Sequence, residues 1–252
     1  HLTLVPYLSA AGELKTKPTQ HSVKTLLESG IQPDVLVCRT EHHLANDIKN
    51  KIALFCNVDK NSVIESRDVD SIYEVPILMQ KEGLDHVVLQ KLKIKDNIKS
   101  NMNDWQIFLK KLKKPEESIT IGLIGKYIEL KDSYKSITES LLHAGTELNC
   151  KVKINWIHSE KINEANIKEK FLGLDGVLVA PGFGDRGTTG KIIAIKYVRE
   201  NNIPFFGICL GMQTAVIEFG LNVLKIPGIN STEIDINCKN PVIHMMHDQK
   251  LI

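Results

Sequence analysis

Close cysteine pairs are absent from this sequence. The five cysteines are odd in number and far apart: Cys38, Cys56, Cys150, Cys209 and Cys238. This spacing argues against both a disulfide framework and a zinc knuckle, because each needs paired or closely spaced thiols. We therefore expect reduced thiols, the usual state in a cytoplasmic enzyme, and expect four of the five to be buried or partly buried small side chains.

Long apolar runs are also missing. The most apolar stretch, residues 203–212, is interrupted by proline and glycine and falls short of the roughly 18 residues that a spanning helix needs. The chain starts at His1, and a strand-like run follows at once without a positively charged segment before it. We expect no signal peptide, no membrane association and a cytoplasmic location. The start resembles the interior of a longer protein.

An excess of charge of one sign is lacking too. The 32 Lys and Arg residues nearly balance 30 Asp and Glu residues, for a formal net charge of +2. Nucleic-acid binding requires a concentrated basic face, whereas the densest lysine run, residues 110–114, is typical of a solvated helix end or linker. We expect no nucleic-acid partner. The 42% hydrophobic and 25% charged residues are typical of a globular protein, and 252 residues suffice for one or two domains.

Strand-like and helix-like segments alternate on both sides of a polar, lysine-rich stretch at residues 95–118, which we interpret as a connector with one short helix. Before it, the pattern predicts strands at 2–6, 34–38 and 62–66 and helices at 22–29, 46–54 and 71–83, the last interrupted at Pro76. After it, the pattern predicts strands at 120–125, 152–157, 176–180 and 204–208 and helices at 133–148, 191–201 and up to about 220. This alternation predicts an α/β fold with a mostly parallel, doubly wound sheet, in which ligands bind at the carboxyl ends of strands.

Cys209 lies in the pattern Gly207-Ile208-Cys209-Leu210-Gly211, which has the G-x-nucleophile-x-G shape of a strand–turn–helix elbow. Such a turn lifts the sulfur out of the strand end and places it at a helix N-terminus, where the helix dipole favours the thiolate. The N–H of Leu210 would then be an oxyanion donor. On these five residues alone, a buried structural cysteine between packing glycines is an equally good interpretation.

The continuation Met212-Gln213 favours the nucleophile, because residues 207–213 closely resemble the nucleophile motif of triad-type glutamine amidotransferases. In that family a Gly-rich turn after an upstream strand supplies the second oxyanion donor. Pro181-Gly182-Phe183-Gly184 follows a predicted strand and matches that place. Alone, such a segment is usually only a turn.

The amino-terminal part resembles a more specific family. Residues 12–23, GELKTKPTQHSV, are similar to the substrate loop of the CTP synthase family, which aminates UTP at C4. Five further runs match that family in order: Lys51–Cys56, Asp68–Tyr73, Gly125–Leu130, Tyr134–Ser136 and Asn230–Glu233. The resemblance covers essentially the whole chain.

The resemblance implies a role for each matching residue. UTP, and CTP as product and feedback inhibitor, would be bound by Lys15, Thr16, Lys17, Pro18, Thr19, Gln20 and Lys51. The ATP adenine would be contacted by Arg67, Asp68 and Val69. L-Glutamine would be held by Gly182, Leu210, Gly211, Met212, Gln213 and Glu233, and Arg186 would belong to the lid linked to GTP activation. Cations suit a triphosphate and a carboxylate suits an α-ammonium group, although in isolation each charged residue would be interpreted as a solvated side chain.

The resemblance also implies the overall organisation. Residues 1–95 would be the C-terminal part of a P-loop-type synthetase domain, 96–118 a linker, and 119–252 the first half of a doubly wound glutamine amidotransferase domain. The family uses ATP with Mg²⁺ and is activated by GTP. A cytoplasmic homotetramer is the implied assembly.

Two family motifs are missing from the sequence. No G-x-x-x-x-G-K-[ST] phosphate loop is present, and Gly125-Lys126-Tyr127 comes nearest. No His-Pro-Glu run follows Cys209. Downstream of Cys209 the only histidines are His244 and His247; neither matches the family's motif, and a polar pair at a strand end or loop is the favoured interpretation. The turn at 180–184 reads Ala-Pro-Gly-Phe-Gly where the family commonly has Pro-Gly-Gly-Phe-Gly. A catalytically incomplete fragment that binds nucleotide or glutamine therefore remains an alternative, as does an amidotransferase with another acceptor.

Overall fold

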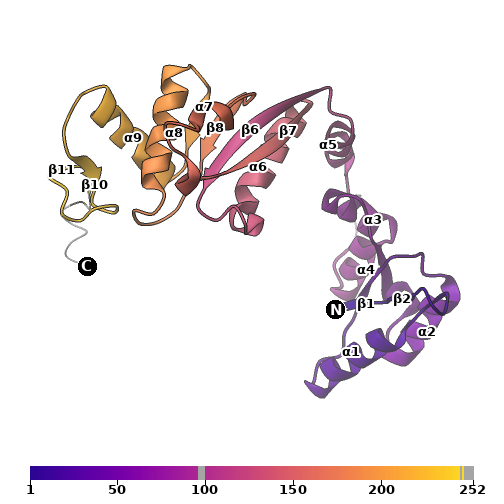
Figure 1. Ribbon diagram of the computed structural model, residues 1–252. Coiled ribbons are helices and arrows are strands. Elements are labelled where there is room, and N and C mark those ends of the chain that lie inside the picture. The colour runs from indigo at the N-terminus through magenta and orange to yellow at the C-terminus, as the bar shows by residue number, and fades with distance from the viewer. Residues whose placement is uncertain (96–99, 245, 247–252) are drawn as a thin grey trace. The chain divides into compact units, whose positions relative to one another are not determined.

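The computed structural model describes residues 1–95, 100–244 and 246. The chain forms two compact units, His1–Lys110 and Lys111–Ile252 (Figure 1). In the described part of the chain, none of the helices combines the length and the apolar character that crossing a membrane requires.

The first unit is built on a parallel three-stranded sheet with the order β1-β4-β5. The strands are β1 (Leu2–Leu4), β4 (Leu36–Thr40) and β5 (Val63–Arg67), and β2 (Tyr7–Leu8) with β3 (Glu13–Leu14) forms a separate antiparallel hairpin. The helices are α1 (Lys17–Glu28), α2 (Asn46–Cys56), α3 (Val75–Lys81) and α4 (Leu84–Lys91). The apolar core of this unit includes Val5, Val23, Leu36 and Ile52.

Two prolines explain where the predicted helix limits were wrong. The helix expected at 22–29 begins earlier, at Lys17, because Pro18 lies in its first turn, where a missing N–H costs nothing. The helix expected at 71–83 is divided into a 3₁₀ turn (Ile72–Glu74) and α3, and Pro76 again lies in the first turn. Each proline therefore starts a helix and does not interrupt one.

The second unit contains a parallel four-stranded sheet with the order β7-β6-β8-β9. Its strands are β6 (Glu117–Gly125), β7 (Cys150–His158), β8 (Gly176–Val179) and β9 (Phe205–Gly207). The helices are α5 (Asn103–Lys113), which spans the division between the units, α6 (Lys135–Glu147), α7 (Ile167–Lys170), α8 (Thr188–Glu200) and α9 (Leu210–Asn222). A short parallel pair, β10 (Ile229–Ser231) and β11 (Asn240–Ile243), follows α9.

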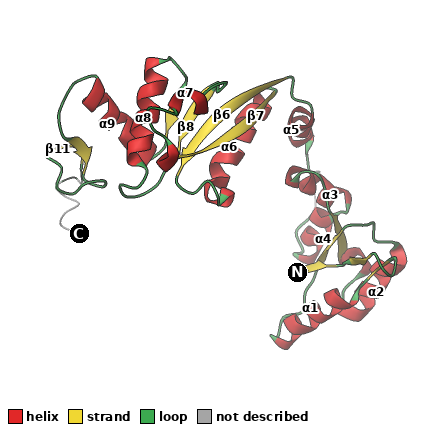
Figure 2. Ribbon diagram, in the orientation of Figure 1, coloured by secondary structure: helices red, strands yellow, loops and turns green. Residues whose placement is uncertain are grey.

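Helices cover both faces of this sheet (Figure 2). On one face Ile124 and Val179 pack with Ala194 and Val198 of α8. On the other face the neighbouring strand residues Leu123 and Leu178 join a cluster that includes Ile137 and Leu141 of α6. Successive strand residues point to opposite faces, so apolar runs such as 176–180 are buried on both sides. The predicted α/β fold with parallel sheets is confirmed.

Candidate active site and nucleotide loop

Cys209 is the N-cap residue between β9 and α9, and its side chain is exposed. Its backbone has φ 53° and ψ −111°, a strained conformation for a residue with a Cβ that is typical of nucleophile elbows. The turn is held by three backbone hydrogen bonds: Ile208 N to Val179 O (3.0 Å), Gly211 N to Ile208 O (2.8 Å) and Gln213 N to Cys209 O (3.0 Å). Exposure excludes the alternative of a buried structural cysteine.

The two glycines of the elbow are required by close backbone approach. A Cβ on Gly207 would lie 2.6 Å from the carbonyl of Gly211, and a Cβ on Gly211 would lie 2.1 Å from the carbonyl oxygen of Val179. Any side chain at either position would push α9 away from the sheet. The glycines therefore set the short strand-to-helix turn that exposes the sulfur.

The other four cysteines are less exposed than Cys209. Cys38 and Cys56 are buried, and Cys150 and Cys238 are partly buried, which confirms the expectation for four of the five thiols. Burial raises the pKa of the Cys56 thiol to about 11, so this thiol stays protonated and unreactive near neutral pH.

The turn after β8 approaches the elbow. Gly182 is buried, and a Cβ placed on it would lie 3.7 Å from Cδ2 of Leu210. Pro181 has no N–H, so Gly182 is the first residue of this turn that can donate. The N–H of Leu210 is at the first position of α9. It has no partner within its own helix because the first N–H groups of an α-helix have no preceding carbonyl to bind. The two residues expected to donate to an oxyanion are thus neighbours in space.

Two buried lysines lie under this turn, and sequence reasoning missed both as site residues. Lys126 follows β6 and donates to the carbonyls of Phe183 and Gly184, and Lys191 of α8 donates to the carbonyl of Ala180 at 2.9 Å. Burial lowers the pKa of Lys126, and burial together with the charge of Lys126 lowers the pKa of Lys191 to about 8. Lys126 falls within the Gly125–Leu130 run, but nothing in the local pattern singled out Lys191.

The expected glutamine-binding residues are brought together at the start of α9. The amide of Gln213 donates to Glu233 at 2.6 Å and accepts from the hydroxyl of Ser231 at 2.8 Å. Ser231 also accepts from the N–H of Glu233 at 3.2 Å. This network ties the loop after β10 to α9 and leaves the Glu233 side chain exposed, whereas Leu210 and Gly211 are buried and Met212 is exposed. Ser231 is the member that the predicted set did not include.

Arg186 is exposed in the loop between β8 and α8. Its guanidinium group forms an ion pair with Glu160 at 3.0 Å and lies over the ring of Tyr127 at 5.5 Å. Sequence reasoning did not include either partner in the predicted lid. A guanidinium group over an aromatic face is a cation–π contact, which orients the arginine side chain.

In the first unit, the predicted UTP residues Lys15 to Gln20 lie at the N-terminus of α1, and Lys51 lies on α2. Lys17 and Lys51 are exposed, and Lys15 pairs with Glu13. The hydrogen bond and charge of Lys15, with a further contribution from Lys51, lower the pKa of the Glu13 carboxyl. The positive charges of Lys15 and Lys51 therefore both stabilise the ionised Glu13 carboxylate. A helix N-terminus with nearby cations suits phosphate binding.

The remaining members of this loop are divided between surface and core. Pro18 is exposed, and Thr16 is buried and accepts a hydrogen bond from the amide of Gln20 at 3.0 Å. Thr19 is fully buried and donates to the carbonyl of Leu4 at 3.0 Å, so its hydroxyl ties α1 to β1.

Arg67 is the last residue of β5, and Asp68 and Val69 follow it at the carboxyl end of the sheet. Arg39 of β4 donates to Asp68 at 2.8 Å, and this hydrogen bond holds the pKa of the carboxyl below its ordinary value. The side chain of Arg67 is exposed. Arg39 was not predicted, and only the parallel register of β4 and β5 places it beside Asp68.

His244 follows β11 and is exposed, whereas His247 lies outside the described residues, as do residues 96–99 of the predicted linker. Within 1–95, 100–244 and 246, no group of three or more His, Cys, Asp or Glu side chains is placed to hold a metal ion.

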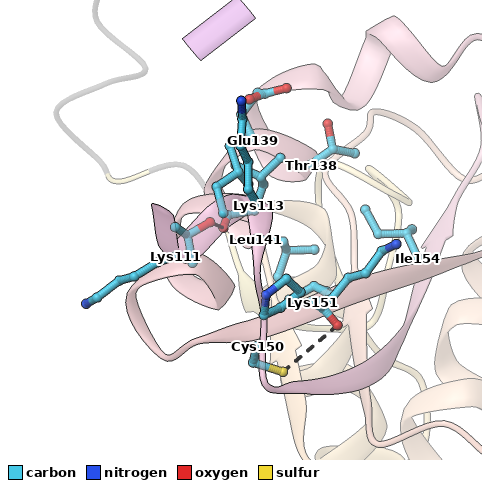
Figure 3. A pocket seen from close by; sticks show the side chains of 13 residues that line it. Lys111, Lys113, Thr138, Glu139, Leu141, Cys150, Lys151 and Ile154 are labelled. Atoms are coloured by element: carbon cyan, nitrogen blue, oxygen red, sulfur yellow. Dashed lines mark hydrogen bonds between the residues drawn. The ribbon is translucent and has the colours of Figure 1, made fainter. Parts of the chain in front are cut away.

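A separate cavity of about 370 Å³ lies between the end of α5, α6 and the start of β7 (Figure 3). Its labelled side chains include Leu141, Cys150 and Ile154, and the Cys150 thiol lies 3.9 Å from the carbonyl of Lys151. Cys150 begins β7, so this cavity opens toward the amino ends of the strands. Cys209 lies at the carboxyl ends, where doubly wound sheets bind ligands.

Each of the two units matches a known protein family. Residues 1–94 match the family described as CTP synthase N-terminus, and residues 129–250 match Glutamine amidotransferase class-I. The CTP synthase of Christiangramia forsetii is 61% identical over 250 residues, which cover 99% of this chain and 46% of that protein. The chain belongs to the CTP synthase family.

Other CTP synthases are similar along the whole chain. That of Flavobacterium johnsoniae is 59% identical over 252 residues, and that of Methanocaldococcus jannaschii is 54% identical over 258, covering 100% of this chain and 47% and 48% of those proteins. A solved structure of the Trypanosoma brucei CTPS glutaminase domain with bound acivicin is 36% identical, with a TM-score of 0.48 and coverage of 52% of this chain and 51% of that one. The chain spans about half the length of the curated CTP synthases it matches.

Proposed function

We propose that this chain is part of a carbon–nitrogen ligase that aminates UTP to CTP, using ATP and ammonia from glutamine, as the last step of de novo CTP synthesis. The observation that carries the proposal is the exposed Cys209 on a strained elbow beside Gly182. Residues 1–95 would form part of the synthetase domain, 96–118 the linker, and 119–252 part of the glutaminase domain.

In the glutaminase half, the Cys209 thiolate attacks the side-chain carbonyl carbon of glutamine. The N–H groups of Gly182 and Leu210 donate to the oxyanion that forms. The amide nitrogen takes up the proton that the Cys209 thiol has lost, and ammonia leaves as the carbonyl is restored in a thioester. Glu233 receives the α-ammonium group of the substrate, and Gln213 fixes Glu233 through its 2.6 Å hydrogen bond. Release of glutamate needs a base that activates water, a role that the family's His-Pro-Glu run would fill and for which this sequence has no equivalent run.

In the synthetase half, Lys15, Lys17 and Lys51 bind the triphosphate of UTP or of the inhibitor CTP, with Thr16, Pro18, Thr19 and Gln20 shaping the loop. Arg67, Asp68 and Val69 contact the ATP adenine. Phosphorylation of O4 of UTP makes this oxygen a leaving group, and ammonia displaces the phosphate at C4. Mg²⁺ would accompany the ATP phosphates, and we assign it no ligands among the described residues.

Arg186 would contribute to a GTP-responsive lid, as the family resemblance implies, and its guanidinium lies over the Tyr127 ring. We further propose a cytoplasmic homotetramer, with no nucleic-acid or membrane partner. These statements rest on the family relationship and on the near-neutral net charge.

The test is covalent labelling of Cys209 by an electrophilic glutamine analogue, located by peptide mass spectrometry. We expect labelling at Cys209 that is blocked by excess glutamine, and no labelling at Cys238, which serves as the internal control thiol. Absence of labelling would contradict the glutaminase assignment. Labelling without glutamine turnover would favour the incomplete fragment.

A UTP-dependent ATPase assay on the full-length protein distinguishes CTP synthesis from amidation of another acceptor. We expect ATP hydrolysis to require UTP. The double variant Lys15→Ala/Lys17→Ala should raise the KM for UTP, and Lys24→Ala, on the same helix α1, is the matched control. Hydrolysis that ignores UTP would contradict this part of the proposal.

A further inference from the structure

Lys126 and Lys191 are buried far beyond what is usual for lysine, with 3% and 0% of their surface exposed. Neither forms a salt bridge with a described carboxylate. Their ammonium groups donate instead to backbone carbonyls of one short segment, residues 180–184. Methionine would fill similar space without the cost of burying a charge, so packing does not explain lysine at either position.

The carbonyls that they hold lie on both sides of Gly182. Lys191 binds the carbonyl of Ala180, and Lys126 binds those of Phe183 and Gly184. A trans peptide points its C=O and the following N–H in opposite directions, so fixing a carbonyl also fixes the orientation of that peptide. Gly182 has the backbone freedom to rotate its own two peptides, 181–182 and 182–183. The two lysines hold the next peptide on each side, 180–181 and 183–184, and so limit how the Gly182 peptides can turn.

Both lysines lie beside Gly182, the residue of the turn that also approaches the elbow. A Cβ on Gly182 would lie 3.7 Å from Nζ of Lys191, 3.6 Å from Cε of Lys126 and 3.7 Å from Cδ2 of Leu210. Lys126 and Lys191 therefore hold the 180–184 turn at the point where this turn contacts Leu210, the residue after Cys209.

We propose that Lys126 and Lys191 are positioning residues that clamp the 180–184 turn, so that the N–H of Gly182 faces the glutamine carbonyl oxygen during attack by Cys209. This inference rests on the proposed glutaminase function. In addition, two positive charges in a buried site stabilise the negative charge that develops on that oxygen.

The charged groups around the pair are consistent with this role. Lys191 experiences the charges of Lys126 and Cys209. Lys126 also experiences Arg186, Asp185, Glu160 and Glu233, from the lid, the strand-end turn and the loop after β10. The carboxylates help to keep Lys126 charged despite its burial.

The experiment compares two electrophiles on the whole chain and on its Lys126→Met and Lys191→Met variants. A chloroketone analogue of glutamine reacts through addition of the thiolate to its carbonyl, which forms an oxyanion, before a carbon–sulfur bond replaces the carbon–chlorine bond and chloride leaves. Iodoacetamide forms the same kind of thioether in one displacement of iodide, without an oxyanion. Lys196→Met, on the same helix but at a partly exposed position paired with Glu164, is the matched control.

We expect each clamp variant to lower the maximal inactivation rate by the chloroketone about tenfold or more, less than the 10²–10³ for loss of a direct oxyanion donor. The reagent concentration at half-maximal rate should change little, and the iodoacetamide rate at Cys209 should stay close to that of the unmodified chain. Lys191→Arg, which keeps a charged donor, should recover part of the chloroketone rate. Circular dichroism reports whether each variant folds. In the case that Lys191→Met does not fold, the test rests on the inactivation rates of Lys126→Met.

Unchanged chloroketone rates, or an equal loss with both reagents, would overturn the clamp. If the unmodified chain reacts with iodoacetamide but not with the chloroketone, the proposed glutaminase function fails and the clamp fails with it. A reactive parent chain with unaffected variants overturns the clamp alone.

Discussion

Cys209 shows how one residue can be recognised from local pattern and still depend on distant contacts. Its positive φ is maintained because Ile208 bonds to Val179 on the neighbouring strand and Gly211 packs against the same carbonyl. Strain of this kind costs on the order of 1–3 kcal/mol and persists only where the surroundings hold it. The strand β8 is therefore part of what exposes the nucleophile.

Lys191 supports a prediction about pH. Its pKa is lowered from 10.5 to about 8 in the folded chain, mainly by burial. Between these pH values the unfolded chain keeps the proton that the folded chain has lost, so the free energy of unfolding rises with pH at up to about 1.4 kcal/mol per unit. Below pH 8 the buried charge destabilises the fold fully, and the penalty disappears as pH approaches 10.5.

We therefore expect the stability of the unmodified chain, relative to Lys191→Met, to increase by about 2–3 kcal/mol between pH 8 and 10.5. Urea unfolding at several pH values, followed by Trp156 fluorescence in a Trp105→Phe background, measures this difference. Lys196→Met should show the same pH dependence as the unmodified chain. A parallel dependence for Lys191→Met would contradict the burial of a titrating lysine.

At the scale of elements, α8 and α9 are joined by a partly buried ion pair. Arg199 of α8 donates to both carboxylate oxygens of Glu218 of α9, with the shortest bond at 2.8 Å. The Glu218 side chain is 1% exposed and that of Arg199 is 34% exposed. Because α9 begins directly after its N-cap residue Cys209, this pair fixes the far part of the helix that presents the nucleophile.

We expect Arg199→Met to destabilise the second unit by about 1–3 kcal/mol, below the full cost of an unpaired buried charge because Arg199 is partly solvated. The pair Lys135–Glu139 on α6, whose lysine is exposed, is the comparison, and Lys135→Met should change stability much less than Arg199→Met. Urea unfolding measures both variants. Equal effects would show that the α8–α9 pair contributes no more than a surface pair.

At the scale of the molecule, the two units have separate apolar cores. The cluster around Leu36 lies entirely within residues 1–110, and those around Ile124 and Leu123 lie entirely within residues 111–252. All candidate glutaminase residues, and Arg186 of the predicted GTP lid, belong to the second unit, whereas all candidate UTP and ATP residues belong to the first.

We predict that a fragment of residues 111–252 folds and that the glutamine analogue labels its Cys209 at a rate within about twofold of the whole chain, because a unit with its own core can fold alone. Circular dichroism and intact mass measure folding and labelling, and the Cys209→Ser fragment is the control. A folded fragment that is not labelled would show that the first unit contributes to the site.

The alternation of strands and helices was predictable because each element has a local signal. Apolar runs such as 176–180 indicate strands buried on both faces. The elbow at Cys209 is encoded by one continuous run, residues 207–213. The limits of α1 and α3 were mispredicted because Pro18 and Pro76 were not recognised as first-turn residues.

The sequence by itself determined the fold class, the nucleophile candidate and the family, since these depend on ordered local motifs. Only the tertiary structure decided that Thr19 faces the core, that Arg39 pairs with Asp68, and that Lys126 and Lys191 bind the turn beside Cys209. A single threonine, arginine or lysine carries no local pattern, and its partner is chosen by strand order and register. The elbow could therefore be predicted from the sequence. The contacts of the buried Lys126 and Lys191 with the turn could not, because they depend on how β6, β8 and α8 pack together.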